Sequence, residues 1–505
     1  MKAKLYFGSI CKDKEEQKEQ KEVRSPYDGR VVSTFSVSNE DDAREILYIA
    51  RKASSQTKLV PMHQRVSWLL DVAQKLESMR EKMALCITEE VGKPITFSRI
   101  EVDRCIETIR LSANAITHVN GETFDTTAMP SGKKSLAFYK REAVGVVLAI
   151  TPFNFPLNLV AHKIAPALVA GNAVILKPTS QAPRTAYEFA KLFIESPYAP
   201  KDALSLIYSG EGVNEALIAS DIPRVISFTG SVGVGREIMQ KAGIKKVALE
   251  LGGNAATYID ASANSALAAK RCAVGAFINS GQVCISLQRI YVHESIYDSF
   301  AKALVEETKS LQVGSPYDEQ TFIGPMVNEA AVEKAKRWVQ SAINEGAKLL
   351  CGAKSKDLMF EPTIMADVTE AMQIVCEEVF APIVSLIKVA HYEEAKEKMN
   401  ASMYGLQYSI FCNDLSMAQR AIDELEAGGI VINDIPTLRF DLQPYGGIRM
   451  AVQAAETYGY EINPELKKIF TTIKTSRRGE LHIIRIKRIW NNEMFSVNYF
   501  RSKIW

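Results

Sequence analysis

The stretch GVVLAI at residues 145–150 begins a series of five short apolar runs that decides the fold class. The four later runs are NAVILK (172–177), LSLIYS (204–209), RVISFT (224–229) and KKVALEL (245–251). Successive runs start 27, 32, 20 and 21 residues apart, which leaves room for a helical crossover each time. Because polar residues do not alternate with the apolar ones, the runs suit strands that are covered on both faces. The pattern predicts a parallel, doubly wound α/β sheet.

A second α/β unit is predicted downstream, from about residue 253 to 432. Its expected helices and strands are 263–279, 288–294, 297–311, 328–345 and, from the string AGGIVIND, 427–434. The chain before the first unit is predicted to be mostly helical. One helix there is capped by Asn39, and one amphipathic run extends from Val66 to Met83. Two α/β lobes with a groove between them are therefore expected.

The composition of the 505 residues is that of an ordinary globular chain, with 47% hydrophobic and 24% charged residues. Its 61 basic and 59 acidic residues give a net charge of +2, which offers no argument for a nucleic-acid or membrane partner. No apolar run reaches about 18 residues, and no secretory signal is expected at the charged N-terminus. Eight scattered cysteines without a C-x-x-C pair favour reduced thiols in the cytoplasm over disulfides or a metal site.

Cys284 is the candidate nucleophile, because it follows a glycine-containing turn, NSGQVCIS, between a predicted helix and a predicted strand. A thiol suits attack on a carbonyl carbon, since its thiolate is already partly populated near neutral pH. Gly281 is expected to bring the backbone close to a ligand. Asn154, after the first strand, can donate to the resulting oxyanion, and Glu250, at the end of the last strand, can activate water. Taken singly, each such residue is more often structural than catalytic.

A second group of residues is placed to hold a nucleotide. Lys177 and Ser180 follow the second strand, where a lysine can bind ribose hydroxyls or a phosphate. The string FTGSVGVG (228–235) joins a strand to a helix start that can hold a phosphate, although its spacing is not G-x-G-x-x-G. Glu378 and Phe380, in EEVFAP, suit a ribose and an aromatic ring.

Together these strings resemble the aldehyde dehydrogenase superfamily over about residues 25–475. The matching strings, in the family's order, are TPFNFP, GNAVILKP, FTGSVGVG, LELGG, GQVC, EEVFAP and PYGG. The resemblance implies two doubly wound α/β lobes with a small β oligomerisation element. The implied divisions are a charged leader (1–24), a dinucleotide-binding domain (25–118 and 142–252), a catalytic domain (253–450), an oligomerisation element (119–141 and 460–475) and a basic tail (476–505).

The resemblance also implies residue roles. Cys284 would be the nucleophile, Glu250 the general base, and Asn154 with the backbone N–H of residue 284 the oxyanion hole. The cofactor, NAD or NADP, would contact Lys177, Ser180, Gly230, Ser231, Gly235, Leu251, Glu378 and Phe380. A thiohemiacetal would lose hydride to the nicotinamide, and activated water would release the acid from a thioester. No metal is implied, and a homodimer or homotetramer is expected.

The strings FNFPLNLVAHKIAPAL and NDIPTLRFDLQPYGG look most like the lactaldehyde dehydrogenase branch. Neighbouring branches leave succinate semialdehyde, phosphonoacetaldehyde and glyceraldehyde 3-phosphate open as substrates. Arg439 lies in a loop that borders the substrate mouth in relatives, so an anionic or hydroxylated small aldehyde is expected, with a solvated loop arginine as the alternative. Val283 stands where relatives with phosphorylated or phosphonate substrates often carry arginine, which favours a less charged substrate. Ser180 replaces a glutamate that would repel a 2′-phosphate, so use of both cofactors or an NADP preference is expected.

The resemblance breaks after PYGG and resumes at EINPELKKI (461–469). A reading-frame slip in the coding DNA is our hypothesis for the interval 451–459. Beyond it, residues 476–505 hold seven basic and two acidic side chains, so the positive net charge of the chain comes from this tail. We expect an exposed or misread extension there rather than a binding surface for anions.

Two other classes of protein compete with this interpretation. A cysteine hydrolase would use the same thiol and oxyanion hole, but it normally needs a histidine base, and His293 and His162 stand in unrelated strings. A catalytically silent family member is disfavoured by the intact Cys284 and Glu250, and the interval 451–459 keeps it open. The sequence therefore predicts NAD(P)-dependent oxidation of a small aldehyde to its acid.

Overall fold

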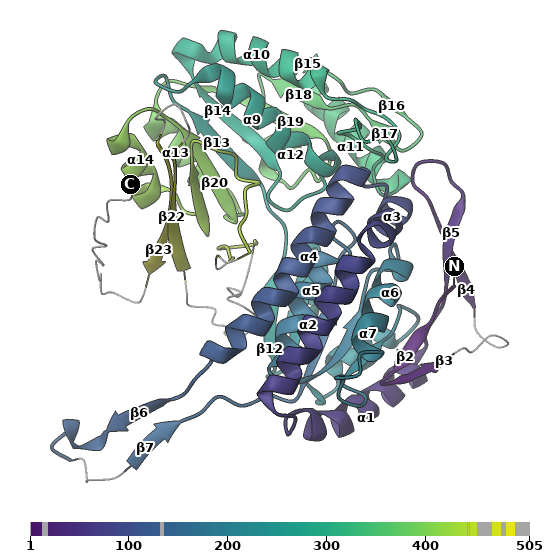
Figure 1. The fold of residues 1–505 in the computed structure, drawn as a ribbon. Helices are drawn as coiled ribbons and strands as arrows, with labels where there is room; N and C mark the ends of the chain where they lie inside the picture. The colour runs from purple at the N-terminus through teal and green to yellow at the C-terminus, as the bar shows by residue number, and fades with distance from the viewer. Residues whose placement is uncertain are drawn as a thin grey trace.

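The computed structural model describes residues 2–12, 19–131, 136–441, 443, 445–451, 467–475 and 481–489. These residues form two α/β lobes, and a slender hairpin projects from the first lobe (Figure 1). The expected two-lobed architecture is confirmed. No helix within the described ranges is both long and apolar enough to cross a membrane.

The first lobe is built on a seven-stranded sheet in the order β12-β11-β8-β9-β10-β2-β3. Five parallel strands coincide with the five apolar runs: β8 (Val146–Ile150), β9 (Ala173–Lys177), β10 (Leu204–Leu206), β11 (Pro223–Thr229) and β12 (Lys246–Glu250). The predicted doubly wound sheet is confirmed, with its central strands fully buried. Chain order reverses between β8 and β11, so the loops after these two strands open a crevice at the carboxyl edge of the sheet.

Eight helices of the described chain pack around this sheet: α1 (Glu40–Thr57), α2 (Met62–Ser78), α3 (Arg80–Val91), α4 (Ile95–Ala115), α5 (Asn158–Val169), α6 (Pro183–Ile194), α7 (Val213–Ala219) and α8 (Val232–Lys241). Asn39 caps α1 as predicted, because its side chain accepts from the Asp42 N–H at 3.0 Å. The single run predicted from Val66 to Met83 is wrong, since Met79 leaves helical geometry and separates α2 from α3. Periodicity hid this break because both helices bury apolar side chains in one core.

The prediction of a charged leader over residues 1–24 is wrong for residues 2–12, which form strands. Strands β2 (Leu5–Phe7) and β3 (Ile10–Lys12) extend the first sheet, and the side chains of β2 are buried. β1 (Lys2–Ala3) and β4 (Gln20–Arg24) instead flank β5 (Val31–Ser36). The apolar run LYF is too short to stand out, and β4 is mostly exposed, so its charges hid a strand.

The second lobe holds a nine-stranded sheet in the order β15-β18-β19-β14-β13-β20-β21-β23-β22. Its strands are β13 (Ala255–Ile259), β14 (Leu287–His293), β15 (Lys348–Cys351), β18 (Thr363–Ala366), β19 (Ile383–Val389), β20 (Gln407–Phe411), β21 (Gly429–Ile432), β22 (Lys467–Thr475) and β23 (Leu481–Ile489). The helices are α9 (Ser265–Phe277), α10 (Tyr297–Ser310), α11 (Glu329–Asn344), α12 (Gln373–Cys376), α13 (Tyr392–Asn400) and α14 (Leu415–Glu424). A short ribbon, β16 (Ser355–Lys356) with β17 (Met359–Phe360), completes the lobe. The predicted elements of this unit are confirmed.

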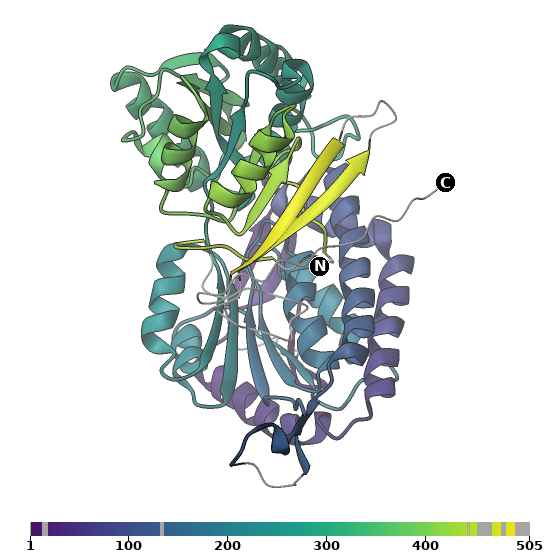
Figure 2. The same cartoon turned by 90° about the vertical axis from the view of Figure 1, so that its left-hand side faces the viewer.

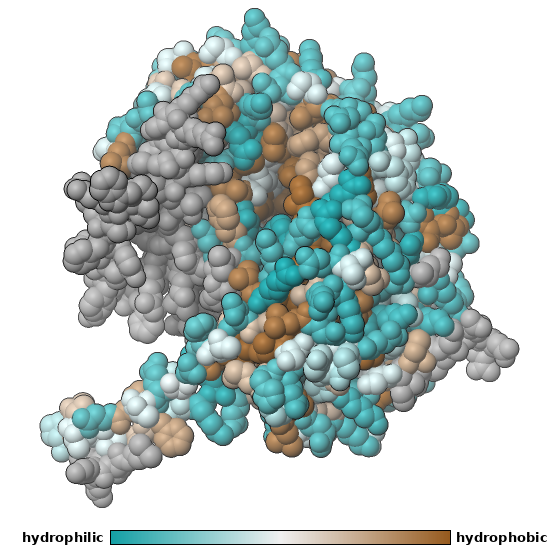
Figure 3. Space-filling view, viewed as in Figure 1, coloured by the Kyte–Doolittle hydropathy of each residue, from teal (hydrophilic) through white to brown (hydrophobic). Residues whose placement is uncertain are grey.

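The two segments assigned to an oligomerisation element lie apart in the structure. β6 (Glu122–Asp125) and β7 (Leu136–Tyr139) form the hairpin, which stands clear of the body (Figure 3). β22 instead continues the second sheet together with β23, which falls inside the expected tail (Figure 2). The interval 452–459 and the rest of the tail lie outside the described residues.

Candidate active site

A cavity of about 550 Å³ opens at the carboxyl edge of the first sheet and is walled by both lobes. Nine of the twelve predicted site residues line it: Asn154, Gly230, Ser231, Glu250, Leu251, Cys284, Glu378, Phe380 and Arg439. The loops after β8 and β11, together with the end of β12, supply those from the first lobe. Lys177, Ser180 and Gly235 do not line this cavity, although they belong to the same lobe.

The turn before Cys284 is held in an uncommon backbone conformation. Asn279, Ser280 and Gly281 have φ values of 51°, 55° and 70°, three successive residues in the left-handed region. A Cβ atom on Gly281 would lie 2.1 Å from the carbonyl oxygen of Ala381. Close packing against the chain, and not approach to a ligand, therefore requires glycine here, which corrects the expectation for Gly281.

The thiol of Cys284 lies 3.4 Å from the hydroxyl of Tyr445. Burial raises the pKa of Cys284 to about 11; the Tyr445 hydrogen bond opposes this, and the carboxylate of Glu250 adds to it. The expectation of a partly populated thiolate is therefore wrong for this enclosed site, because a buried thiolate beside a negative charge is disfavoured. A base has to remove the proton for the sulfur to attack.

Glu250 has the properties of that base. Thr229 donates to its Oε2 at 3.0 Å, while the buried Oε1 has no hydrogen-bond partner among the described residues. Burial alone would raise its pKa, but the positive charges of Lys163 and Arg439 bring the pKa below the ordinary value. The carboxylate is thus ionised at neutral pH, with one oxygen open to accept a proton.

The amide of Asn154 is fixed in one orientation. Its Oδ1 accepts from the Phe155 N–H at 3.1 Å, and its Nδ2 donates to the carbonyl of Gln282 at 3.1 Å. One N–H of the amide is left for a further acceptor in the cavity. The bond to Gln282 also ties the loop after β8 to the turn that carries Cys284.

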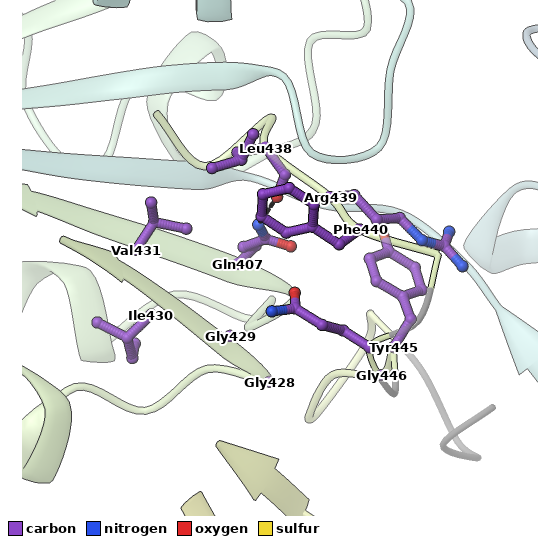
Figure 4. A pocket seen from close by; sticks show the side chains of 11 residues that line it. Gln407, Gly428, Gly429, Ile430, Val431, Leu438, Arg439, Phe440, Tyr445 and Gly446 are labelled. Atoms are coloured by element: carbon purple, nitrogen blue, oxygen red, sulfur yellow. Dashed lines mark hydrogen bonds between the residues drawn. The ribbon is translucent and has the colours of Figure 1, made fainter. Parts of the chain in front are cut away.

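Residues of the segment 439–451, which follows the last helix and strand β21 of the second lobe, pack beside the cavity. Tyr445 packs with Val283 and Ala451 around Cys284, and the guanidinium of Arg439 lies 3.8 Å from the centre of the Tyr445 ring (Figure 4). The Leu251 N–H donates to the carbonyl of Ala451 at 2.8 Å. This segment is therefore joined directly to the strand end that carries the candidate base.

The residues assigned to a nucleotide have features that fit a dinucleotide. Burial lowers the pKa of Lys177 to about 8, and only 8% of this residue is exposed. Ser231 caps α8, whose first N–H groups are available to an anion. Cβ atoms on Gly230 and Gly235 would lie 2.4 Å from Phe228 and Leu251, so both glycines are fixed by close packing.

Glu378 and Phe380 line the cavity at the other wall. The Gly253 N–H donates to Glu378 Oε1 at 2.8 Å, and burial raises the pKa of this carboxyl to about 7. The ring of Phe380 packs edge-on against that of Phe153, with centroids 6.0 Å apart. Glu378 thus offers a carboxyl oxygen that suits a ribose hydroxyl, and Phe380 offers a ring face that suits the nicotinamide of a dinucleotide.

Several residues at the cavity had not been singled out in the sequence: Lys93, Glu101, Arg104, Tyr445 and Asp441. Tyr445 stands in PYGG, so its motif was visible while its contact with the thiol was not. The others come from α4, the turn before it and the loop after β21, and no local pattern joins them. No cluster of potential metal ligands occurs within the described ranges.

The comparisons with known proteins agree with this geometry. The model of the aldehyde dehydrogenase family matches residues 13–468, so the chain belongs to that family. It is 40% identical over 446 residues to 3-sulfolactaldehyde dehydrogenase of Priestia megaterium, covering 88% of this chain and 93% of the relative. It is 37% identical over 463 residues to lactaldehyde dehydrogenase of Methanococcus aeolicus, covering 90% and 97%.

Solved structures show the same fold. The NADP complex of NADP-dependent glyceraldehyde-3-phosphate dehydrogenase from Bacillus halodurans superposes with a TM-score of 0.88 at 31% identity, covering 92% of this chain and 97% of that one. Lactaldehyde dehydrogenase from Escherichia coli gives a TM-score of 0.87 at 30% identity, covering 91% and 97%. The recognition from seven short strings is thereby confirmed.

Proposed function

We propose that this chain oxidises a small anionic or hydroxylated aldehyde to its carboxylic acid, with NAD or NADP as the hydride acceptor. The observation that carries the proposal is one cavity that holds a thiol, an ionised carboxylate and a fixed amide donor, in Cys284, Glu250 and Asn154. The family membership and the NADP complexes of similar structures support the choice of reaction and cofactor.

In the proposed mechanism, Glu250 removes the thiol proton of Cys284, and the sulfur attacks the carbonyl carbon. Asn154 Nδ2 and the backbone N–H of Cys284 stabilise the oxyanion. The nicotinamide, when bound against Phe380 and Glu378, supplies the hydride acceptor. After passing the thiol proton to solvent, Glu250 takes a proton from the water that attacks the thioester and returns it to the departing sulfur, which frees the acid and the thiol.

The charge of the cavity wall supports an anionic substrate. Arg104 donates to both carboxylate oxygens of Asp441, at 2.8 and 3.1 Å, and Arg439 lies 3.7 Å from the same carboxylate. Burial lowers the pKa of the adjoining His162, so that side chain is neutral. Arg104 and Arg439 therefore place two guanidinium groups at this wall, and guanidinium is the donor that suits a carboxylate, sulfonate or phosphate group. Similar proteins are named for 3-sulfolactaldehyde and glyceraldehyde 3-phosphate.

Replacing Arg104 with methionine should raise KM for an anionic aldehyde such as succinate semialdehyde by about 10- to 100-fold, because a charge-assisted hydrogen bond is lost. KM for uncharged lactaldehyde should change about twofold or less, since no such bond is made. Arg110→Met is the matched control: Arg110 lies on the same helix and pairs with Glu77 at the surface. Equal losses with both substrates would contradict an anion contact at Arg104.

We also propose that NADP is used at least as well as NAD. Ser180 is exposed beyond the end of β9 and brings no negative charge to the place where a 2′-phosphate is expected. Ser180→Glu should weaken NADP binding by about 10-fold or more through like-charge repulsion, and should leave NAD binding nearly unchanged. Titration calorimetry with both cofactors measures this, with Ser180→Gln as the uncharged control. Turnover with NAD alone in the wild-type protein would contradict the proposal.

A homodimer or homotetramer is also proposed. Two-stranded hairpins are marginal on their own, and β6–β7 exposes Phe124, Met129 and Phe138 away from the body. A second copy of the chain is the occupant that we propose for these side chains. We further propose a cytoplasmic location, which the eight free cysteines support.

A further inference from the structure

A buried ion pair lies behind the loop that carries Asn154. Lys93, in the turn between α3 and α4, pairs with Glu101 of α4. Only 1% of the Lys93 side chain and none of the Glu101 side chain are exposed. Such a pair is costly to bury and is weak evidence for a stabilising role, because desolvation offsets the attraction of the charges. Its hydrogen bonds indicate a different use.

Both side chains hold the loop after β8. The ammonium of Lys93 donates to the backbone carbonyl of Asn154 at 2.6 Å and lies 3.9 Å from the centre of the Phe155 ring. Glu101 Oε1 accepts from the N–H groups of Leu157 and Asn158, at 2.9 and 3.1 Å. The pair therefore holds this loop through its backbone at two points, at Asn154 in its middle and at its junction with α5.

The hydrogen-bonded loop is in turn connected to the turn that carries the nucleophile, Cys284. Asn154 Nδ2 donates to the carbonyl of Gln282, two residues before Cys284, and Gln282 Oε1 accepts from the Val327 N–H at 3.0 Å. The bond from Val327 helps to hold the turn that carries Cys284. A shift of Asn154 would therefore change the distance between the Asn154 amide and the Cys284 sulfur. Displacement of about 1 Å in such an arrangement can cost about 100-fold in rate.

We propose that Lys93 and Glu101 are positioning residues for catalysis. They hold the amide of Asn154 at the distance from the Cys284 sulfur at which its free N–H can donate to the oxyanion. The inference rests on the proposed function, since it assigns the pair to the oxyanion step of that reaction. Neither side chain exchanges a proton with the substrate in this role.

Lys93→Met keeps the length of the side chain and removes the shorter of two hydrogen bonds to the Asn154 carbonyl, since Asn279 Nδ2 also donates to it, at 3.5 Å. We expect kcat to fall about 10- to 100-fold, with KM and cofactor affinity within about twofold, because the oxyanion contact is lost in the transition state and not in the ground state. Lys82→Met is the control, since Lys82 forms an ion pair of α3 with Glu188 outside the cavity. That variant should keep the wild-type kcat.

The double variant Lys93→Met/Glu101→Gln separates positioning from stability. It removes both charges together, so thermal stability should recover relative to Lys93→Met, whereas kcat should stay low. Recovery of kcat along with stability would overturn the inference. A second test adds Lys93→Met to Asn154→Ala. Because Lys93 acts through Asn154, the added change should lower kcat about twofold or less, and a full additional loss would also overturn the inference.

Acylation of Cys284 by p-nitrophenyl acetate gives a readout that needs no cofactor and uses the same oxyanion donors. The rate of nitrophenolate release should fall in Lys93→Met by the same factor as kcat. If the wild-type protein is acylated but oxidises no aldehyde, the proposed function fails and the inference is still tested by this rate. If the wild-type protein oxidises aldehydes and Lys93→Met matches it in both assays, the inference alone fails.

Discussion

Cys284→Ala should lower aldehyde-dependent formation of NADPH, followed at 340 nm, by about 10⁴-fold or more, because the covalent route loses its nucleophile. Alanine only truncates a half-buried side chain, so the folded structure should persist. NADP should still bind with nearly the wild-type affinity, since the residues that we propose for the nucleotide do not include Cys284. This loss separates the dehydrogenase from a catalytically silent family member.

Cys11→Ala provides the matched control, because Cys11 is an exposed thiol of β3 that does not line the cavity. That variant should keep full activity. Appreciable turnover in Cys284→Ala would contradict the assignment of the nucleophile. Aldehyde-independent ester cleavage without any reduction of cofactor in the wild-type protein would favour a cysteine hydrolase instead.

Glu250→Gln should lower steady-state turnover by about 10²- to 10⁴-fold, since the general base is lost. Glutamine has nearly the same shape and can still accept from Thr229, which donates to the present carboxylate. Because the proposed mechanism also gives Glu250 the thiol proton, formation of the first equivalent of NADPH should slow as well, and little thioester on Cys284 should accumulate. Mass spectrometry of the quenched protein measures that adduct.

The pH dependence follows from the same carboxylate. The charges of Lys163 and Arg439 overcome the effect of burial and lower the pKa of Glu250, so general-base catalysis by this carboxylate should persist from neutral pH into the acidic range and fall as Glu250 is protonated. Glu250→Gln should lack this acidic limb. An unchanged steady-state rate in the variant would contradict the role, and loss of the first turnover as well would assign thiol deprotonation to the same residue.

The parallel sheet was predictable because its strands are buried on both faces, so runs such as 145–150 contain no polar alternation. Strand β4 was not predictable from the sequence, because most of its residues are exposed and charged residues dominate it. Cys284 and Glu250 were accessible because each stands beside glycines in a short, local string. Family resemblance then ordered these strings into one site.

Long-range contacts explain what sequence reasoning missed. Lys93 meets the Asn154 carbonyl across 61 positions, and Arg104 meets Asp441 across 337, so no local spacing joins them. The raised pKa of Cys284 was also inaccessible, because it depends on burial and on Glu250, which only the closed cavity brings near. Motifs thus identified reacting groups, and the structure added the groups that orient them.

The contacts of Tyr445 and Ala451 with the walls around Cys284 affect the order in which a nascent chain acquires its site. The first lobe and the cysteine turn leave the ribosome well before these residues, and domains generally fold as units during synthesis. The reactive thiol is therefore enclosed only after most of the chain has been translated. A ribosome that stalls before residue 445 would carry a folded first lobe beside an open cysteine.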